Sequence, residues 1–190
     1  MTPNRYTTVA IWLHWIIALL IIVNLALGFG REWVERDVAG QLMWFHRPIG
    51  LTVLLLSVAR LVWRLLHSVP GYAETTPPWQ AFFARAVHWG FYLLIIAMPL
   101  VGWLIVSTGR APTGIDVFGL FNWPVLPIDL GADRAAVHGG LKEVHEYGGY
   151  LILGLLALHI GAVLKHIFID RDDVAARMLP FAGWRRREIV

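Results

Sequence analysis

The chain has 190 residues, of which 57% are hydrophobic and only 15% are charged, and its formal net charge is +3. A water-soluble domain carries about a quarter charged residues, so this composition indicates a membrane protein. The absence of cysteine excludes structural disulfides, iron–sulfur clusters and thiolate metal ligands.

Four apolar segments are candidates for membrane-spanning helices, which need about 20 mostly apolar residues. We predict these helices near residues 9–29, 46–66, 86–108 and 144–168. The second segment contains Arg47, Arg60 and Arg64, which we place near the ends of the span or against a buried anion. The predicted fold class is all-α, with residues 1–190 forming one domain, an integral membrane four-helix bundle.

The distribution of basic residues predicts the orientation of this bundle, because cytoplasmic loops are enriched in Lys and Arg. Four spans put the N-terminus, the loop at 68–79 and the C-terminus on one side. That side holds ten of the 16 basic residues: Arg5, Arg60, Arg64, Arg85, Lys165, Arg171, Arg177, Arg185, Arg186 and Arg187. We therefore expect both termini in the cytoplasm. The positive net charge then reflects topology, and nucleic acid binding has no separate support.

Four histidines lie in the apolar segments, where ionisable side chains are rare and usually functional. His14 opens the first predicted helix and His46 opens the second, whereas His145 and His159 both lie on the fourth. The fourteen residues from His145 to His159 span about 21 Å along a helix and return to within about 40° of the same face. Both imidazoles are therefore expected to face one interior, one near each leaflet.

The direction of each helix assigns a partner to each histidine. The first helix enters from the cytoplasm, and the second and fourth enter from outside. His46 and His145 then share the outer depth, while His14 and His159 share the inner depth. Two histidine pairs at two depths are what two bis-histidine haems require, because bis-imidazole iron is a common cytochrome arrangement. A non-redox metal transporter that uses the same histidines is the alternative.

Small residues beside these histidines are compatible with a bulky cofactor. Gly50 lies four residues past His46, and Gly148 and Gly149 lie three and four residues past His145. Positions three and four residues apart share a helix face, so these glycines would leave room for a porphyrin. Close packing between helices explains the same glycines equally well.

Arg60 is a candidate partner for a haem propionate, because it lies fourteen residues past His46 and therefore at the inner depth. Snorkelling of its side chain to lipid phosphate is the alternative. The remaining histidines, His67, His88, His138 and His166, are more typical of interfacial polar residues. Lys165 and His166 are nevertheless candidates for binding a quinone carbonyl, because they lie just cytoplasmic of the inner pair.

The chain resembles the bacterial cytochrome b561 family in an ordered series of short motifs. They are IWLHW at 11–15, HRPIG at 46–50, VARLVWR at 58–64, AVH at 86–88, YLL at 92–94, AMP at 97–99 and KHIFIDRDD at 165–173, together with His145 and His159. Each motif is weak alone, but the ordered set is specific and covers almost the whole chain.

The resemblance implies a multi-pass protein of the bacterial inner membrane that binds two b-type haems through His14, His46, His145 and His159. It also implies electron exchange with quinone, ubiquinone being the expected one, and with an unknown periplasmic donor or acceptor. One family member oxidises periplasmic superoxide and passes the electron to ubiquinone. Similar four-helix cytochromes are membrane subunits of hydrogenases and formate dehydrogenases. Three functions therefore stay open: an electron carrier, a superoxide:ubiquinone oxidoreductase and the anchor subunit of a dehydrogenase.

Two features depart from the family pattern. Pro48 stands where the family more usually has serine, and because proline disfavours helix at the preceding residue, we expect the second helix to start or kink there. The outer face is also predicted to be net negative, whereas a surface that collects superoxide should be positive. A local patch around Arg47, Arg110, Arg134 and Lys142 would still supply positive charge.

Overall fold

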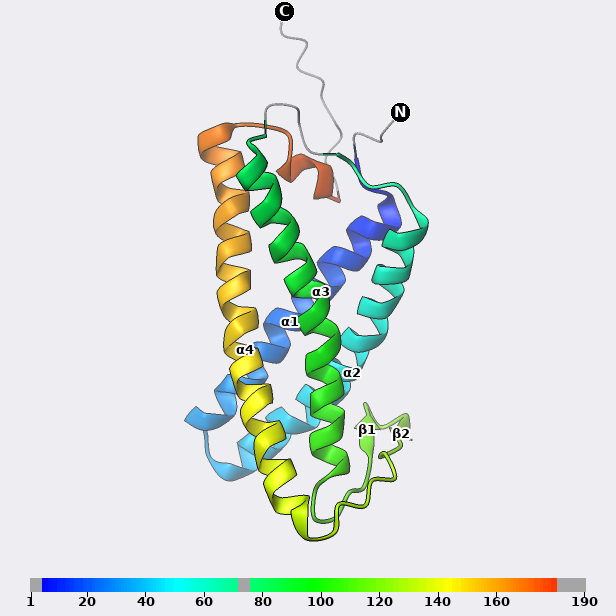
Figure 1. Cartoon of the computed structure of the whole chain (residues 1–190). Helices are drawn as coiled ribbons and strands as arrows, with labels where there is room; N and C mark the ends of the chain where they lie inside the picture. The colour runs from blue at the N-terminus through cyan, green and yellow to red at the C-terminus, as the bar shows by residue number, and fades with distance from the viewer. Residues whose placement is uncertain (1–4, 72–75, 181–190) are drawn as a thin grey trace, which may run out of the picture.

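The computed structural model describes residues 5–71 and 76–180, and Figure 1 shows that long helices dominate it. The four long helices are α1 (Thr8–Gly30), α2 (Arg36–Leu66), α3 (Pro78–Ser107) and α4 (Arg134–Lys165). The short elements are η1 (Arg31–Trp33), β1 (Ile115–Val117), β2 (Phe121–Trp123), η2 (Gly131–Asp133), the π-helical turn η3 (His166–Asp170) and η4 (Ala175–Met178). The predicted all-α membrane bundle is confirmed.

The surfaces of the helices match a lipid environment rather than water. All four long helices are long and apolar enough to cross a membrane. Of the 18-residue apolar window in each segment, only 11% is buried within the protein for α1 and 6% for α4. Apolar surface exposed to this extent is a liability in water but is the expected outside of a bundle in hydrocarbon.

Local signals account for the ends of the helices. Thr7 caps α1, because its hydroxyl accepts a hydrogen bond from the backbone N–H of Ala10 at 3.3 Å. Pro78 occupies the first turn of α3, where its missing N–H costs nothing. At the other end of the chain, α4 runs into η3, and Arg171 then reverses the backbone with a φ of 52°.

Three helices begin earlier than predicted. The predicted starts near 46, 86 and 144 become Arg36, Pro78 and Arg134. Hydropathy detects only the part of a helix that lies in hydrocarbon, and polar turns that continue the helix beyond it carry no such signal. His46 therefore lies well inside α2, and the expectation that it opens the second helix was wrong.

Pro48 lies inside α2, and its side chain is fully buried. The helix therefore does not start there. Figure 1 shows that α2 changes direction along its length, which is what an internal proline causes by removing a backbone hydrogen bond. The hydroxyl of Thr52, four residues later, donates a hydrogen bond to the Pro48 carbonyl at 2.9 Å.

The helices pack in chain order, and this order leaves a gap. Close backbone contacts join α1 to α2, α2 to α3, and α3 to α4. Within the described residues, α4 does not pack closely against α1 or α2. A buried cluster of Ile17, Val53, Tyr92 and Ile95 ties the first three helices together. We call the space between α4 and the α1–α2 hairpin the interhelical gap.

One end of the bundle carries the start of α1, the end of α2, the start of α3 and the end of α4 (Figure 1). The indole N–H of Trp15 donates to the Met178 carbonyl at 2.8 Å and ties the two ends of the described chain together. We call this the inner end, following the predicted orientation, and the opposite one the outer end. The segment between α3 and α4 contains an antiparallel β1–β2 hairpin, in which Val117 packs on Leu51 and Leu54 of α2.

Candidate functional site

Two histidines face each other across the interhelical gap toward the outer end, and we call them the outer couple. They are His46 of α2 and His145 of α4, whose ring centroids lie 6.0 Å apart with the ring planes at 74°. The Nδ1 atom of His46 lies 3.0 Å from the backbone carbonyl oxygen of Asn24 on α1. A carbonyl can only accept, so Nδ1 of His46 carries the proton and Nε2 is free to bind a metal.

The inner couple repeats this geometry. His14 of α1 and His159 of α4 have ring centroids 6.1 Å apart and ring planes at 72°. The structure thus brings together the same residues that helix direction paired by depth.

The spacing of both couples matches one metal ion between two imidazoles. Imidazole nitrogens bind first-row metals at about 2 Å, so two such bonds on opposite sides of an ion, with half of each ring added, separate the ring centres by about 6 Å. With no cysteine in the chain, the available ligands are nitrogens, as in bis-histidine cytochromes.

The surroundings of the outer couple also fit a flat macrocycle. A cavity of about 490 Å³ is lined by both members of the couple and by Gly50 and Gly149. A Cβ atom at either glycine would make only ordinary contacts, 3.4 Å from Asn24 Nδ2 or from Phe29 Cζ. Both glycines thus line the cavity without a side chain of their own that would occupy it. Gly148 is different, because a Cβ there would collide with the Met98 side chain of α3, so its role is close packing of α3 on α4.

A third imidazole lies at the inner couple. The ring centroid of His88 on α3 is 5.8 Å from that of His159, and Phe91 packs on the same ring at 5.7 Å. The prediction had treated His88 as an interfacial residue. Its depth matched the inner pair, and this was the signal that could have identified it.

Two arginines lie beside the inner couple without an acidic partner. The guanidinium groups of Arg60 and Arg64 lie over the Tyr92 ring, at 5.6 and 5.8 Å from its centroid. Neither forms an ion pair with any residue that the structure describes. Arg60 is close enough to His14 and His159 to interact with both electrostatically. A positive charge thus lies near the inner couple, where it could interact with an acidic group of a bound cofactor.

Lys165 and His166, the candidate quinone-binding residues, lie at the inner end. Each contacts the carboxylate of an aspartate that follows it closely in the sequence. Lys165 pairs with Asp170. The Nδ1 atom of His166 lies 2.7 Å from an Asp172 carboxylate oxygen, and the αL backbone of Arg171 turns Asp172 back toward His166. The Asp172 carboxylate fixes the proton on Nδ1 of His166, and the opposite ring nitrogen is then available to a ligand.

The other two histidines have local partners outside both couples. His67 stacks on Trp63 with 3.9 Å between ring centroids, and His138 makes a hydrogen bond of 3.1 Å with the Thr108 hydroxyl.

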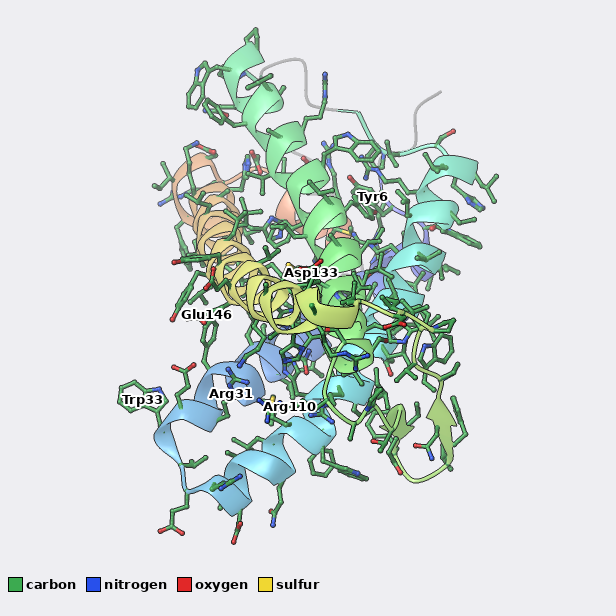
Figure 2. All side chains as sticks on the ribbon, turned by 60° about the horizontal axis from the view of Figure 1, so that its bottom comes forward. Tyr6, Arg31, Trp33, Arg110, Asp133 and Glu146 are labelled. Carbon is green, nitrogen blue, oxygen red and sulfur yellow. The ribbon has the colours of Figure 1, made fainter. Side chains whose placement is uncertain are left out.

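The outer cavity opens among charged side chains. Arg31, Arg47, Arg110 and Lys142 line it, and Glu32 and Glu146 are the acidic residues among the lining. Figure 2 shows Arg31, Arg110 and Glu146 around the outer opening between α1, α2 and α4. Arg134, the fourth member of the predicted patch, instead donates to the Gly109 carbonyl at 3.0 Å. Arg31 was not predicted, because its place depends on how η1 turns back over the gap.

Comparison with known proteins agrees with this geometry. Residues 5–181 match the family described as prokaryotic cytochrome b561. The chain is 33% identical to Cytochrome b561 homolog 2 of Escherichia coli (strain K12), in an alignment covering 94% of this chain and 93% of that protein. It is 28% identical to the Probable superoxide oxidase CybB of Yersinia pestis, covering 93% and 97%, and 32% identical to Cytochrome b562 of Cereibacter sphaeroides, covering 92% and 94%.

The family match spans nearly all described residues, including both histidine couples, and the relatives align over almost their whole length. Four apolar helices and paired imidazoles are the features that a b-type cytochrome of the membrane requires. This chain belongs to the prokaryotic cytochrome b561 family.

Proposed function

We propose that this protein is a di-haem cytochrome that transfers electrons across the bacterial inner membrane to or from the quinone pool. The observation that supports this most directly is the pair of imidazole couples with centroids 6.0 and 6.1 Å apart. His46 and His145 would hold one haem, and His14 and His159 the other. A bound haem supplies a reversible one-electron couple of its iron, and the protein supplies ligands, orientation and a low-dielectric shell.

The surrounding residues have separate roles in this proposal. The Asn24 carbonyl orients His46, while Gly50 and Gly149 keep the outer cavity open. Arg60 would compensate the charge of a propionate of a haem held at the inner couple. The two ligand levels on α4 are about 21 Å apart, and the porphyrin edges would be closer than that. The proposed partners are membrane lipid, quinone and a periplasmic electron donor or acceptor. In this proposal both termini lie in the cytoplasm.

Replacement of a single ligand tests the number and pairing of the haems. His145→Ala and His159→Ala should each lower the haem-to-protein ratio from two to one, measured as pyridine haemochrome in purified protein, because each couple loses one axial ligand. Leu153→Ala is the control on α4, because Leu153 is exposed and lies outside the cavity lining, and it should keep both haems. Full retention of haem in both ligand variants would contradict the pairing.

His14 and His88 compete for the role of partner to His159, and the packing favours His14. Because the backbones of α3 and α4 pack closely, a porphyrin has no room between these two helices, whereas no comparably close backbone packing joins α1 to α4. His14→Ala should therefore lose the inner haem, and His88→Ala should keep it, as read from the haem-to-protein ratio. The opposite pattern would make His88 the ligand.

Lys165 and His166, which are positioned by Asp170 and Asp172, support a quinone site at the inner end. Reduction of a quinone consumes two electrons and two protons. Electrons would come one at a time from a haem held at the inner couple, and His166 in its protonated form would donate the Nε2 proton to a quinone oxygen. Asp172 would keep the Nδ1 hydrogen bond during this transfer, and the neutral imidazole that remains would take up a proton from the cytoplasm and donate it in turn, so that both protons are supplied.

His166→Phe tests this site, because it removes the proton donor and preserves an aromatic ring. The rate at which a short-chain ubiquinone oxidises the reduced protein in stopped flow should fall about 10²-fold or more, with haem content unchanged. His67→Phe, the same substitution at another inner-end histidine, is the control and should leave the rate unaltered. An unchanged rate in His166→Phe would exclude His166 as the donor.

A second candidate function is oxidation of superoxide, and the cationic lining of the outer cavity favours it. The outer face is predicted to be net negative, but the position of each acidic residue matters more for steering superoxide than the total charge. Asp116 and Asp129 do not line the cavity, and their carboxylates accept hydrogen bonds from the nearby backbone N–H groups of Gly119 and Gly131. In the balanced reaction, two superoxide anions each give one electron and leave as oxygen, and one quinone takes up both electrons and two protons.

Charge reversal at the cavity tests this second function. Arg110→Glu should lower the rate at which superoxide reduces the haems by about tenfold, and raising the salt concentration should narrow the difference, because steering of an anion is electrostatic. Arg36→Glu is the control, since Arg36 begins α2 at the same end and is exposed outside the cavity lining. Equal effects of the two variants, or no reduction by superoxide in the unaltered protein, would reject the second function.

A further inference from the structure

We propose that Gly28 of α1 and Gly102 of α3 are positioning residues for the outer haem, because each seats an axial imidazole directly against the backbone of a neighbouring helix. The proposal rests on the ligand roles of His46 and His145 proposed above. It concerns how their rings are oriented, which neither the pairing nor the family match specifies.

The His46 ring lies against one turn of α1, from Asn24 to Gly28. A Cβ atom at Gly28 would lie 3.1 Å from Cε1 and 3.4 Å from Nδ1 of the His46 ring. The first distance is shorter than the 3.5–4.0 Å or so at which carbon atoms attract. The same Nδ1 atom makes its hydrogen bond with the carbonyl of Asn24, four residues before Gly28. One helical turn therefore supplies both the acceptor and the free space that the ring occupies.

The His145 ring makes a similar close approach to a glycine of α3. A Cβ atom at Gly102 would lie 3.3 Å from Cε1 and 3.8 Å from Nδ1 of the His145 ring. Nδ1 of His145 is buried and has no hydrogen-bond partner in the described part of the chain. His145 therefore shares with His46 the close approach to a glycine but not the hydrogen bond to a carbonyl.

The rings of the inner couple do not lie against a glycine in this way. No described glycine lies in this way against His14 or His159. The His159 ring is instead surrounded by the rings of His14, His88 and Phe91, at 5.7 to 6.1 Å between centroids. The outer ligands are thus oriented by backbone and the inner ligands by side chains.

This difference has a chemical consequence. A ligand imidazole that donates its second N–H to a carbonyl has a fixed tautomer and is a more basic ligand. A methyl group at Gly28 would push the His46 ring away from the Asn24 carbonyl, and a methyl group at Gly102 would displace the His145 ring. The electronic state of the outer iron should therefore respond to substitutions at Gly28 and Gly102, although neither residue reaches the cofactor through a side chain.

The test uses the full-length, haem-loaded protein in detergent, with the separate variants Gly28→Ala and Gly102→Ala. The readouts are the haem-to-protein ratio, the low-temperature EPR signals of the ferric haems and their midpoint potentials. Each variant should retain two haems and shift the largest g value and the midpoint potential of one haem, leaving the other unchanged. The larger Gly28→Val should lower the haem-to-protein ratio from two to one, and the surviving inner haem reports that the protein is folded.

Gly154→Ala is the matched control, because Gly154 lies on α4 between the two ligand levels and a Cβ atom there would meet nothing within 4 Å. It should leave both EPR signals and both potentials unchanged. The proposal is overturned if Gly28→Ala and Gly102→Ala leave both signals as they are, or if they alter both haems equally. A wild-type protein that binds fewer than two haems would instead refute the proposed function, whatever the glycine variants do.

Discussion

An imidazole in hydrocarbon needs a partner, and α4 directs two imidazoles, fourteen residues apart, toward the interhelical gap. The partners come from two different helices, His14 from α1 and His46 from α2. This arrangement requires α4 to stay at a distance from both helices, since direct packing would leave no space between the rings. The sequential packing of α1 on α2, α2 on α3 and α3 on α4 meets that requirement.

The two ends of the gap are built for different chemistry. At the outer end Arg31 and Arg110 line the cavity, and the rings of His46 and His145 lie against helix backbone at Gly28 and Gly102. Toward the inner end, Arg60 has no acidic partner among the described residues, and His166 is held by Asp172. An anion is thus favoured at the outer opening, whereas a proton-linked acceptor is favoured at the inner one. This asymmetry suits electron transfer between an external reactant and quinone.

The sequence predicted the helices in hydrocarbon and the pairing by depth, because both follow from apolar length and from the repeat of the α-helix. It placed the starts of three helices too late, because polar turns outside the membrane carry no hydropathy signal. The approach of His88 to His159 depends on how closely α3 packs against α4. The contacts of Gly28 and Gly102 with ligand rings depend on crossing geometry between helices, which no spacing within one helix encodes.

Location of the iron atoms tests the central claim most directly. Anomalous diffraction at the iron absorption edge, recorded from crystals of the purified protein, should give two peaks per chain, separated by about 20 Å along α4. One peak should lie between the rings of His14 and His159, and the other between those of His46 and His145. A single peak, or an inner peak between His88 and His159, would contradict the account.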